Sequence, residues 1–225
     1  MFRDRPLPTV LFALYLVVGV GYLAAGALDW RLGGWLTKPA LMPLLALALL
    51  TLLTRPGPVA VPWWLVAGLV LDGAGDTALL AGSPGWFLAG MALFGAGHLC
   101  YLTALVRVGA VRRALGRPLV LVGYALFWLA VLAALWPHLG GLRLPVAGYS
   151  LLLTAMAAAT TGLGWRTGLG GGLFLLSDTL IALDLARVEL LAGQGWLVMP
   201  TYLAGQALIV AYWLWPARRR AGVAA

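Results

Sequence analysis

The sequence predicts an all-α integral membrane protein with about eight transmembrane helices. Hydrophobic residues make up 63% of its 225 residues and charged residues only 10%, whereas a soluble domain is about 25% charged. The apolar residues also form long unbroken runs, and a helix of roughly 20 apolar residues crosses a hydrocarbon core about 30 Å thick. Such runs favour helices over the strands of a transmembrane barrel, which show only about ten alternating residues each.

Eight apolar stretches are separated by short polar breaks. We expect them to cross the membrane at residues 8–28, 37–53, 61–80, 85–107, 118–137, 144–163, 168–186 and 196–216. The second stretch is the shortest and begins at Thr37-Lys38-Pro39, so counts of seven and nine helices stay open. Because the connections are too short to hold an extramembrane domain, we expect residues 1–225 to form a single polytopic transmembrane domain.

A weak internal sequence repeat suggests two halves of four helices each. The segment Gly75-Asp76-Thr77-Ala78-Leu79 resembles Ser177-Asp178-Thr179-Leu180-Ile181, which lies 102 residues further along the chain. Since four is an even number, the halves would share one orientation and be related by an axis along the membrane normal, as parallel repeats are. This arrangement would place Asp76 and Asp178 at equivalent depths across a central cleft.

The arginines predict the orientation in the membrane. Eleven arginines lie at the termini or in connections on the same side as the termini: Arg3, Arg5, Arg55, Arg107, Arg112, Arg113, Arg117, Arg166, Arg218, Arg219 and Arg220. Only three lie in the opposite loops: Arg31, Arg143 and Arg187. The positive-inside rule then places both termini in the cytoplasm, as in a multi-pass protein of a bacterial-type inner membrane. This placement explains the net charge of +8 without a nucleic-acid partner. A patch for anionic membrane lipid, formed by Arg112, Arg113 and Arg117, is an alternative use of part of this charge.

Three aspartates, Asp72, Asp76 and Asp178, lie inside predicted spans. A charged side chain at mid-membrane costs about 2.5–3.5 kcal/mol, so each is a candidate functional residue. Asp72 and Asp76 are four residues apart and share a helix face, and two such close carboxylates do not easily both carry charge in a low dielectric. The alternative is a structural role in interhelical hydrogen bonds worth about 0.6–2 kcal/mol each. Asp184 lies about 240° around the helix from Asp178, and we expect it to be solvated at the helix end.

Other polar residues in the spans could support these carboxylates. Lys38, the only lysine, either extends its ammonium to the interface or pairs with a carboxylate or a substrate phosphate. His98 and Tyr101 are three residues apart and face the same way. They form a candidate polar site or, alternatively, bonded core residues.

Tyr202 and Gln206 are similarly spaced four apart, with interhelical hydrogen bonding as the alternative role. We interpret Tyr124 and Tyr149 as packing residues, because neither has a polar partner in register on its own helix.

The sequence points away from metal and nucleotide chemistry. With two histidines and one cysteine, it can form neither a three-histidine zinc site nor a His-Glu-x-x-His motif. We interpret the glycines of residues 168–172 as helix-packing positions, since no strand precedes them as it would precede a nucleotide-binding loop. We therefore expect no cofactor and no metal.

Several short motifs together resemble the YhhN family of membrane proteins, whose eukaryotic relatives are lysoplasmalogenases. They run in family order over residues 37–210: Lys38-Pro39, Gly75-Asp76 with Leu79-Leu80, Phe94-Gly95 with His98 and Tyr101, Ser177-Asp178, and Thr201-Tyr202 with Gln206. The resemblance implies eight helices and hydrolysis of the vinyl ether of a lysoplasmalogen, a lysophospholipid, to a fatty aldehyde and a glycerophospho-ethanolamine or -choline. It implies Asp76 and Asp178 as the catalytic pair. The residues that would line the substrate site are Lys38, Asp72, His98, Tyr101, Ser177, Tyr202 and Gln206. Asp72 departs from the family pattern, in which a small residue is more typical.

This chemistry suits two carboxylates. Vinyl ether hydrolysis begins with protonation of carbon and passes through an oxocarbenium ion, so it needs one carboxylic acid and one carboxylate, as glycoside hydrolysis does. Repulsion from Asp72 favours Asp76 as the acid and Asp178 as the base, with carboxyl groups about 5–10 Å apart. A proton-coupled transporter of a small molecule or lipid could use the same aspartates. A structural membrane protein could use them only for hydrogen bonds.

Overall fold

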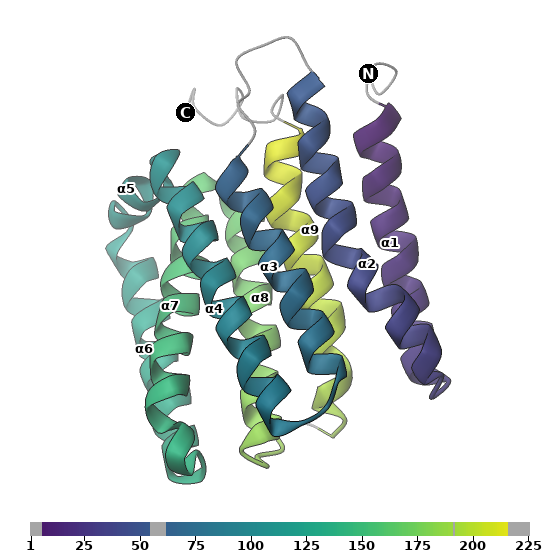
Figure 1. Ribbon diagram of the computed structural model, residues 1–225. Helices are drawn as coiled ribbons and strands as arrows, with labels where there is room; N and C mark the ends of the chain where they lie inside the picture. The colour runs from purple at the N-terminus through teal and green to yellow at the C-terminus, as the bar shows by residue number, and fades with distance from the viewer. Residues whose placement is uncertain (1–5, 55–61, 191, 216–225) are drawn as a thin grey trace. The chain divides into compact units, whose positions relative to one another are not determined.

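The computed structural model describes residues 6–54, 62–190 and 192–215, and helices form nearly all of this part of the chain (Figure 1). The α-helices are α1 (Pro6–Ala27), α2 (Arg31–Leu50), α3 (Trp63–Leu80), α4 (Pro84–Arg107), α5 (Ala110–Leu115), α6 (Pro118–Leu135), α7 (Arg143–Thr160), α8 (Trp165–Leu185) and α9 (Val198–Leu214). Short 3₁₀ turns extend several of them, among them η1 (Thr51–Thr54) after α2, η4 (Thr161–Leu163) after α7 and η5 (Gln194–Leu197) before α9. No strand occurs among the described residues.

Eight helices of the described chain are long and apolar enough to cross a membrane, which confirms the predicted fold class. They cover Leu7–Ala27, Arg31–Leu53, Trp63–Leu80, Pro84–Arg107, Pro118–His138, Gly140–Leu163, Trp165–Leu185 and Gln194–Leu214. The protein is therefore a multi-pass membrane protein. The remaining α-helix, α5, is too short to cross a membrane, because it has only 6 residues. It lies in a connection that the sequence predicts as a loop.

The largest difference from the predicted spans is at the start of α2. The helix begins at Arg31, six residues before the predicted start at Thr37, and it contains Pro39 and Pro43. Proline is tolerated inside a transmembrane helix because side chains and neighbouring helices satisfy the freed backbone groups. Lys38 therefore lies about 10 Å inside the helix, and its predicted position at the helix end is wrong.

The chain divides into two compact units, and each is described by itself. Unit 1 comprises residues 1–104 and 210–225, and unit 2 comprises residues 105–209. The division falls at the end of α4, where the two predicted four-helix halves meet, although the last turns of α9 belong to unit 1. That the whole chain forms one domain stays a prediction.

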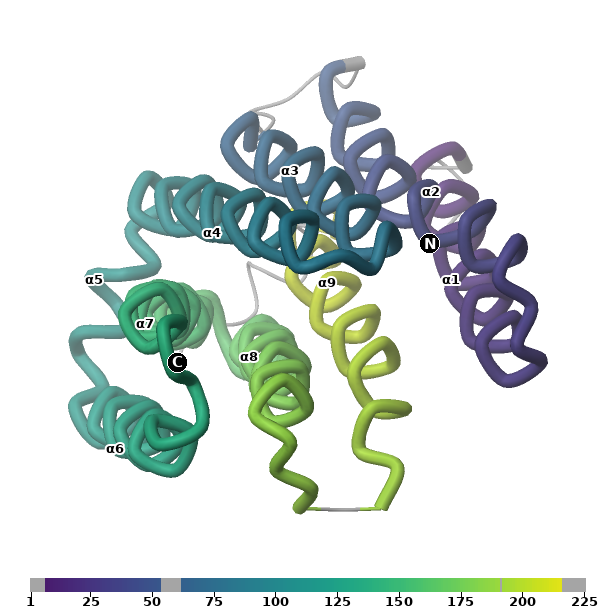
Figure 2. The backbone as a smooth tube through the Cα atoms, turned by 60° about the horizontal axis from the view of Figure 1, so that its bottom comes forward, coloured from purple at the N-terminus to yellow at the C-terminus, as the bar shows by residue number. Residues whose placement is uncertain are grey.

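In unit 1, α1 packs on α2 and α2 packs on α3, and α3 and α4 lie side by side (Figure 2). The contact between α3 and α4 is made through glycines. A Cβ atom at Gly68 or Gly97 would lie 3.2 or 3.3 Å from the carbonyl oxygen of the other. Gly75 and Gly90 face each other in the same way, at 3.3 Å in both directions. Small residues at such a contact let two helix backbones come close in the membrane. This glycine seam brings the side chains of α4 against Asp72.

In unit 2, α7 packs against both α6 and α8. The glycines at the start of α8 face three different helices. A Cβ at Gly170 would lie 2.9 Å from the Gly205 carbonyl of α9, one at Gly171 would lie 3.0 Å from the Cα of Ala157 in α7, and Gly172 faces Tyr124 of α6. Successive residues of a helix point about 100° apart, so a run of glycines admits a neighbour on each side. The interpretation of this segment as a helix-packing element is confirmed.

The short helix α5 is fixed to the end of α7 by two arginines. Arg113 Nε donates to the Gly162 carbonyl at 2.7 Å, and Arg117 donates to the Thr161 carbonyl at 2.8 Å. Cations at a helix C-terminus satisfy its last carbonyls and interact favourably with the helix dipole. Two of the three residues of the predicted anionic-lipid patch therefore have structural contacts.

Candidate functional site

The buried polar groups of unit 1 centre on an ion pair between α2 and α3. Lys38 Nζ lies 3.3 Å from Asp76 Oδ1, with the two side chains 9% and 3% exposed. The Lys38 ammonium also lies 5.8 Å from the centre of the Tyr22 ring of α1. Of the two roles that the sequence leaves open for Lys38, the structure shows pairing with a carboxylate.

Asp72 lies one turn before Asp76 on α3 and is fully buried. The Tyr101 hydroxyl of α4 donates a hydrogen bond to Asp72 Oδ2 at 2.8 Å. Gly97 makes this contact sterically feasible, because a Cβ there would lie 2.3 Å from Asp72 Oδ1. The two carboxylates of α3 thus have different partners: Asp76 contacts a cation and Asp72 contacts a phenol.

Two further buried residues belong to the same region of unit 1. His98 is fully buried on α4, and its ring stacks near Phe94 with 6.5 Å between ring centres. Tyr15 of α1 is also fully buried and lies within electrostatic range of Asp76. The sequence analysis does not single out Tyr15. Its only sequence signal is a tyrosine within an apolar span, where a phenol usually has a polar partner.

The centre of the polar groups in unit 2 is Asp178 on α8. The Tyr149 hydroxyl of α7 donates a hydrogen bond to Asp178 Oδ2, and both residues are half-buried. The interpretation of Tyr149 as a packing residue is therefore wrong. Its partner is on the next helix, so the spacing of polar residues within α7 gives no sign of the contact.

The remaining predicted site residues of unit 2 are buried on α8 and α9. Ser177, Tyr202 and Gln206 are 1%, 3% and 0% exposed. The Tyr202 ring packs edge-on against Phe174 at 5.2 Å. Asp184 is exposed near the end of α8, as the sequence predicts.

Each unit thus presents a buried or half-buried aspartate whose partner comes from the preceding helix: Lys38 for Asp76 and Tyr149 for Asp178. These groups can donate, accept and hold protons, and they can stabilise a cation. Among the described residues, no three His, Cys, Asp or Glu side chains are placed to hold a metal ion. The groups around Asp76 and Asp178 that can donate and accept protons support acid-base chemistry by side chains.

In the comparison with family models, the model of the YhhN family matches residues 33–213. This range includes all the predicted site residues. Neither the curated proteins nor the solved structures contain a match to the chain.

Proposed function

Because the chain belongs to the YhhN family, we propose that it is an intramembrane hydrolase that, like lysoplasmalogenase, cleaves the vinyl ether bond of a lysoplasmalogen. The observation that carries this proposal is the buried ion pair of Lys38 and Asp76. A buried ion pair loses its hydration, and replacing it by apolar residues is often neutral or stabilising, so it is weak evidence for a role in stability. In a transmembrane segment, ionisable residues more often mark a functional site.

The reaction requires proton transfer to carbon. An acid protonates the alkene carbon that is not bonded to oxygen, and the positive charge is then shared by the other carbon and the ether oxygen. Water adds to that carbon while a base accepts one of its protons, which gives a hemiacetal. The hemiacetal breaks its bond to the glycerol oxygen, and this oxygen takes up a proton. The products are a fatty aldehyde and a glycerophospho-ethanolamine or -choline, and one water is consumed.

We assign the base to Asp76 and the acid to Asp178, the reverse of the assignment favoured by the sequence. That earlier assignment depends on repulsion between Asp72 and Asp76. In the structure a lysine ammonium lies 3.3 Å from Asp76, and an opposite charge this close favours the ionised carboxylate. Asp178 instead accepts a hydrogen bond from a neutral phenol. A charged Asp76 could stabilise the oxocarbenium ion and accept the proton of water, as the second carboxylate does in glycosidases.

Lys38 and Tyr149 then act as positioning residues, because they hold Asp76 and Asp178. Asp72, held by Tyr101 one turn from Asp76, would bind the polar part of the substrate together with His98. Ser177, Tyr202 and Gln206 would do the same from unit 2. The proposal requires the carboxyl groups of Asp76 and Asp178 to come within about 5–10 Å of each other, the range found in paired-carboxylate enzymes.

Purified protein in lipid nanodiscs tests the activity. The substrate is a lysoplasmalogen, and the controls are the saturated alkyl ether and the acyl ester with the same head group. We expect aldehyde and glycerophospho-ethanolamine in equal amounts from the vinyl ether only. In D₂O the aldehyde should carry one deuterium at its second carbon, because the acid protonates that carbon; added aldehyde controls for exchange.

A folded preparation that releases no aldehyde would overturn the proposal. If the same protein instead takes up protons in step with a lipid or small molecule in proteoliposomes, the aspartates serve transport.

A further inference from the structure

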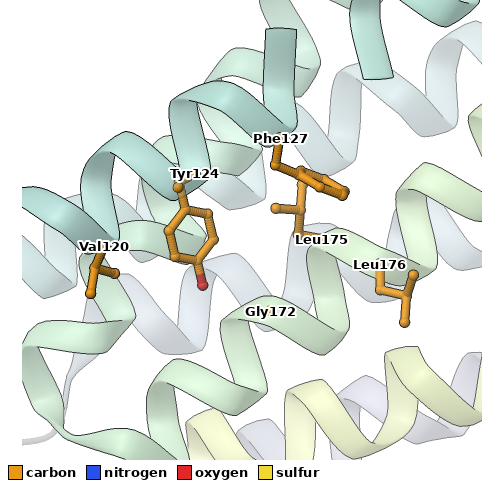
Figure 3. Close-up of a pocket in the computed structure, with 7 residues that line it drawn as sticks. Val120, Tyr124, Phe127, Gly172, Leu175 and Leu176 are labelled. Carbon is orange, nitrogen blue, oxygen red and sulfur yellow. The ribbon is translucent and has the colours of Figure 1, made fainter. Parts of the chain in front are cut away.

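Helices α6 and α8 of unit 2 form an apolar groove of about 340 Å³ (Figure 3). Its lining residues are Val120, Gly123, Tyr124 and Phe127 of α6 and Gly172, Leu175 and Leu176 of α8. Glycine keeps the groove open on both helices. A Cβ atom at Gly123 would meet no other atom within 4 Å, and one at Gly172 would meet only the Tyr124 hydroxyl at 3.7 Å.

The groove lies at the surface of spanning helices. Only 6% of the apolar span that contains α6 is buried inside the protein, less than for any other span of the described chain. Val120, Phe127 and Leu176 are correspondingly exposed, at 38%, 40% and 40%. Since both helices are membrane spans, the medium that meets this surface is hydrocarbon.

The groove occupies one leaflet of the bilayer. Along α8 it extends from Gly172 to Leu176, which is about 10–17 Å from the start of the helix at Trp165. Along α6 it extends from Val120 to Phe127, about 3–14 Å from the start at Pro118. The hydrocarbon core is about 30 Å thick, so each leaflet contributes about half of that. The groove therefore runs from the membrane surface at which α6 and α8 begin to about the bilayer centre.

Tyr124 gives this groove a polar contact point. Its ring crosses the groove from α6, and its hydroxyl points toward α8 at Gly172 (Figure 3). Among the described residues this hydroxyl makes no hydrogen bond. A polar group that lacks a partner in an apolar medium is unfavourable by about 1–3 kcal/mol. A lipid whose first oxygen lies at this depth would supply the missing acceptor.

We infer that the groove binds a single-tailed lipid, with the hydrocarbon tail along Phe127 and Leu176 and the oxygen at the head of the tail accepting a hydrogen bond from Tyr124. The volume is at the low end for ligand pockets, which run to about 300–1,000 Å³, and so suits one tail rather than two. A lysolipid of ether or ester type has this chemistry.

This site is separate from the proposed catalytic residues. Asp178 is beyond the tail end of the groove along α8, whereas the bond to be hydrolysed would be at the head end near Tyr124. The groove therefore holds a lipid without placing its ether at Asp178. The inference does not depend on the proposed hydrolase activity.

Photolabelling of the intact protein in nanodiscs tests the inference. The probe is an alkyl-ether lysophosphatidylcholine that carries a diazirine in its tail, which no ether hydrolase of the proposed type would cleave. Labelled peptides are identified by mass spectrometry. We expect labels to concentrate on residues 120–127 and 172–176, and excess unlabelled lysolipid to compete several-fold better than diacyl phospholipid.

Three variants sharpen the test. Gly123→Leu fills the groove and should reduce labelling of these two segments at least fivefold. Gly148→Leu is the matched control, because Gly148 is an exposed glycine of α7 whose added Cβ would also meet nothing within 4 Å, and it should have no effect. Tyr124→Phe should weaken binding of the lysolipid several-fold but not that of a diazirine alkane.

The inference fails if labels spread evenly over all exposed helices, which would show ordinary annular lipid. It also fails if the two segments are labelled to the same extent in Gly123→Leu as in the wild type. Crosslinks that join α6 of two copies of the protein and exclude the probe would overturn it as well. An unchanged lysolipid affinity in Tyr124→Phe would overturn the role of the hydroxyl.

Discussion

Lys38 of α2 and Asp76 of α3 form a buried ion pair with 3.3 Å between Nζ and Oδ1. Lys38 is the only lysine of the protein, and its side chain extends within the membrane-spanning part of α2. A lysine that served only as an interfacial anchor would instead direct its ammonium toward the head groups. The pair links two neighbouring helices and sets the charge environment of the carboxylate that we propose as the base.

Breaking this pair from one side should destabilise the protein. Lys38→Met leaves the Asp76 carboxylate buried without its cation, for which about 3–5 kcal/mol is typical. The double variant Lys38→Met with Asp76→Asn removes both charges and should recover much of this loss. Thermal unfolding in detergent measures both. Additive losses in the double-mutant cycle would contradict an energetic coupling between the two residues.

The same substitution separates two roles in catalysis. If Lys38 positions Asp76, Lys38→Met should lower kcat and change KM little, because the interaction supports the transition state. The sequence-based role in binding a substrate phosphate predicts a higher KM instead, since that contact is present in the ground state and the transition state alike. Steady-state kinetics with a lysoplasmalogen distinguishes these outcomes.

Asp76→Asn and Asp178→Asn should each reduce aldehyde release by about 10²–10⁴-fold, the usual contribution of general acid-base groups. Asparagine keeps the shape of aspartate but cannot exchange the proton. Asp184→Asn is the matched control, because it makes the same change at an exposed position of α8 and should retain full activity. If the variants at 76 and 178 fold and still release aldehyde at near wild-type rates, these aspartates are structural.

Tyr149→Phe should lower kcat by about 2–10-fold, because the hydrogen bond between Tyr149 and a protonated Asp178 joins two neutral groups, and such a bond contributes about 0.5–1.5 kcal/mol. The ring stays in place, so the packing of α7 against α8 should change little. Circular dichroism and the melting temperature verify the fold, and the kinetics give kcat and KM. A change in KM alone would mean that Tyr149 contacts the substrate and does not position Asp178.

Gly97→Ala should destabilise unit 1 by about 1–3 kcal/mol, as overpacking of a close contact does. The new methyl group would lie 2.3 Å from Asp72 Oδ1, so Asp72 must move and weaken its hydrogen bond with Tyr101. Gly85→Ala on the same helix meets nothing within 4 Å and is the control. Equal melting temperatures for the two variants would show that the glycine seam tolerates a side chain at Gly97.

A reporter fused to the C-terminus tests the orientation. Eleven arginines on the side of the termini against three on the other predict a cytoplasmic C-terminus. A reporter that is active only in the cytoplasm should therefore give a signal, and one that is active only outside should not. The opposite pattern of reporter signals would reverse the predicted orientation, and the groove between α6 and α8 would then lie in the other leaflet.

Membership of the family and the helical spans follow from the sequence because each depends on local information. The length of an apolar run decides whether a helix crosses the bilayer, and the order of short motifs identifies the YhhN family, whose model matches residues 33–213. The start of α2 is an exception. The sequence places it at Thr37, just before Lys38-Pro39, but in the membrane a helix continues through proline where other groups satisfy its backbone.

The sequence by itself determined that Asp72, Asp76 and Asp178 lie within membrane spans, where an ionisable group is rarely without a function. Only the tertiary structure decided their partners: Lys38 for Asp76, Tyr101 for Asp72 and Tyr149 for Asp178. The periodicity of one helix shows which residues share its face, but not how a neighbouring helix is rotated or shifted against it. That rotation and shift depend on packing between helices, at Gly68 and Gly97 among others. In unit 2 the packing of α7 on α8 makes Tyr149 a hydrogen-bond donor to Asp178, whereas its own helix suggests only a packing residue.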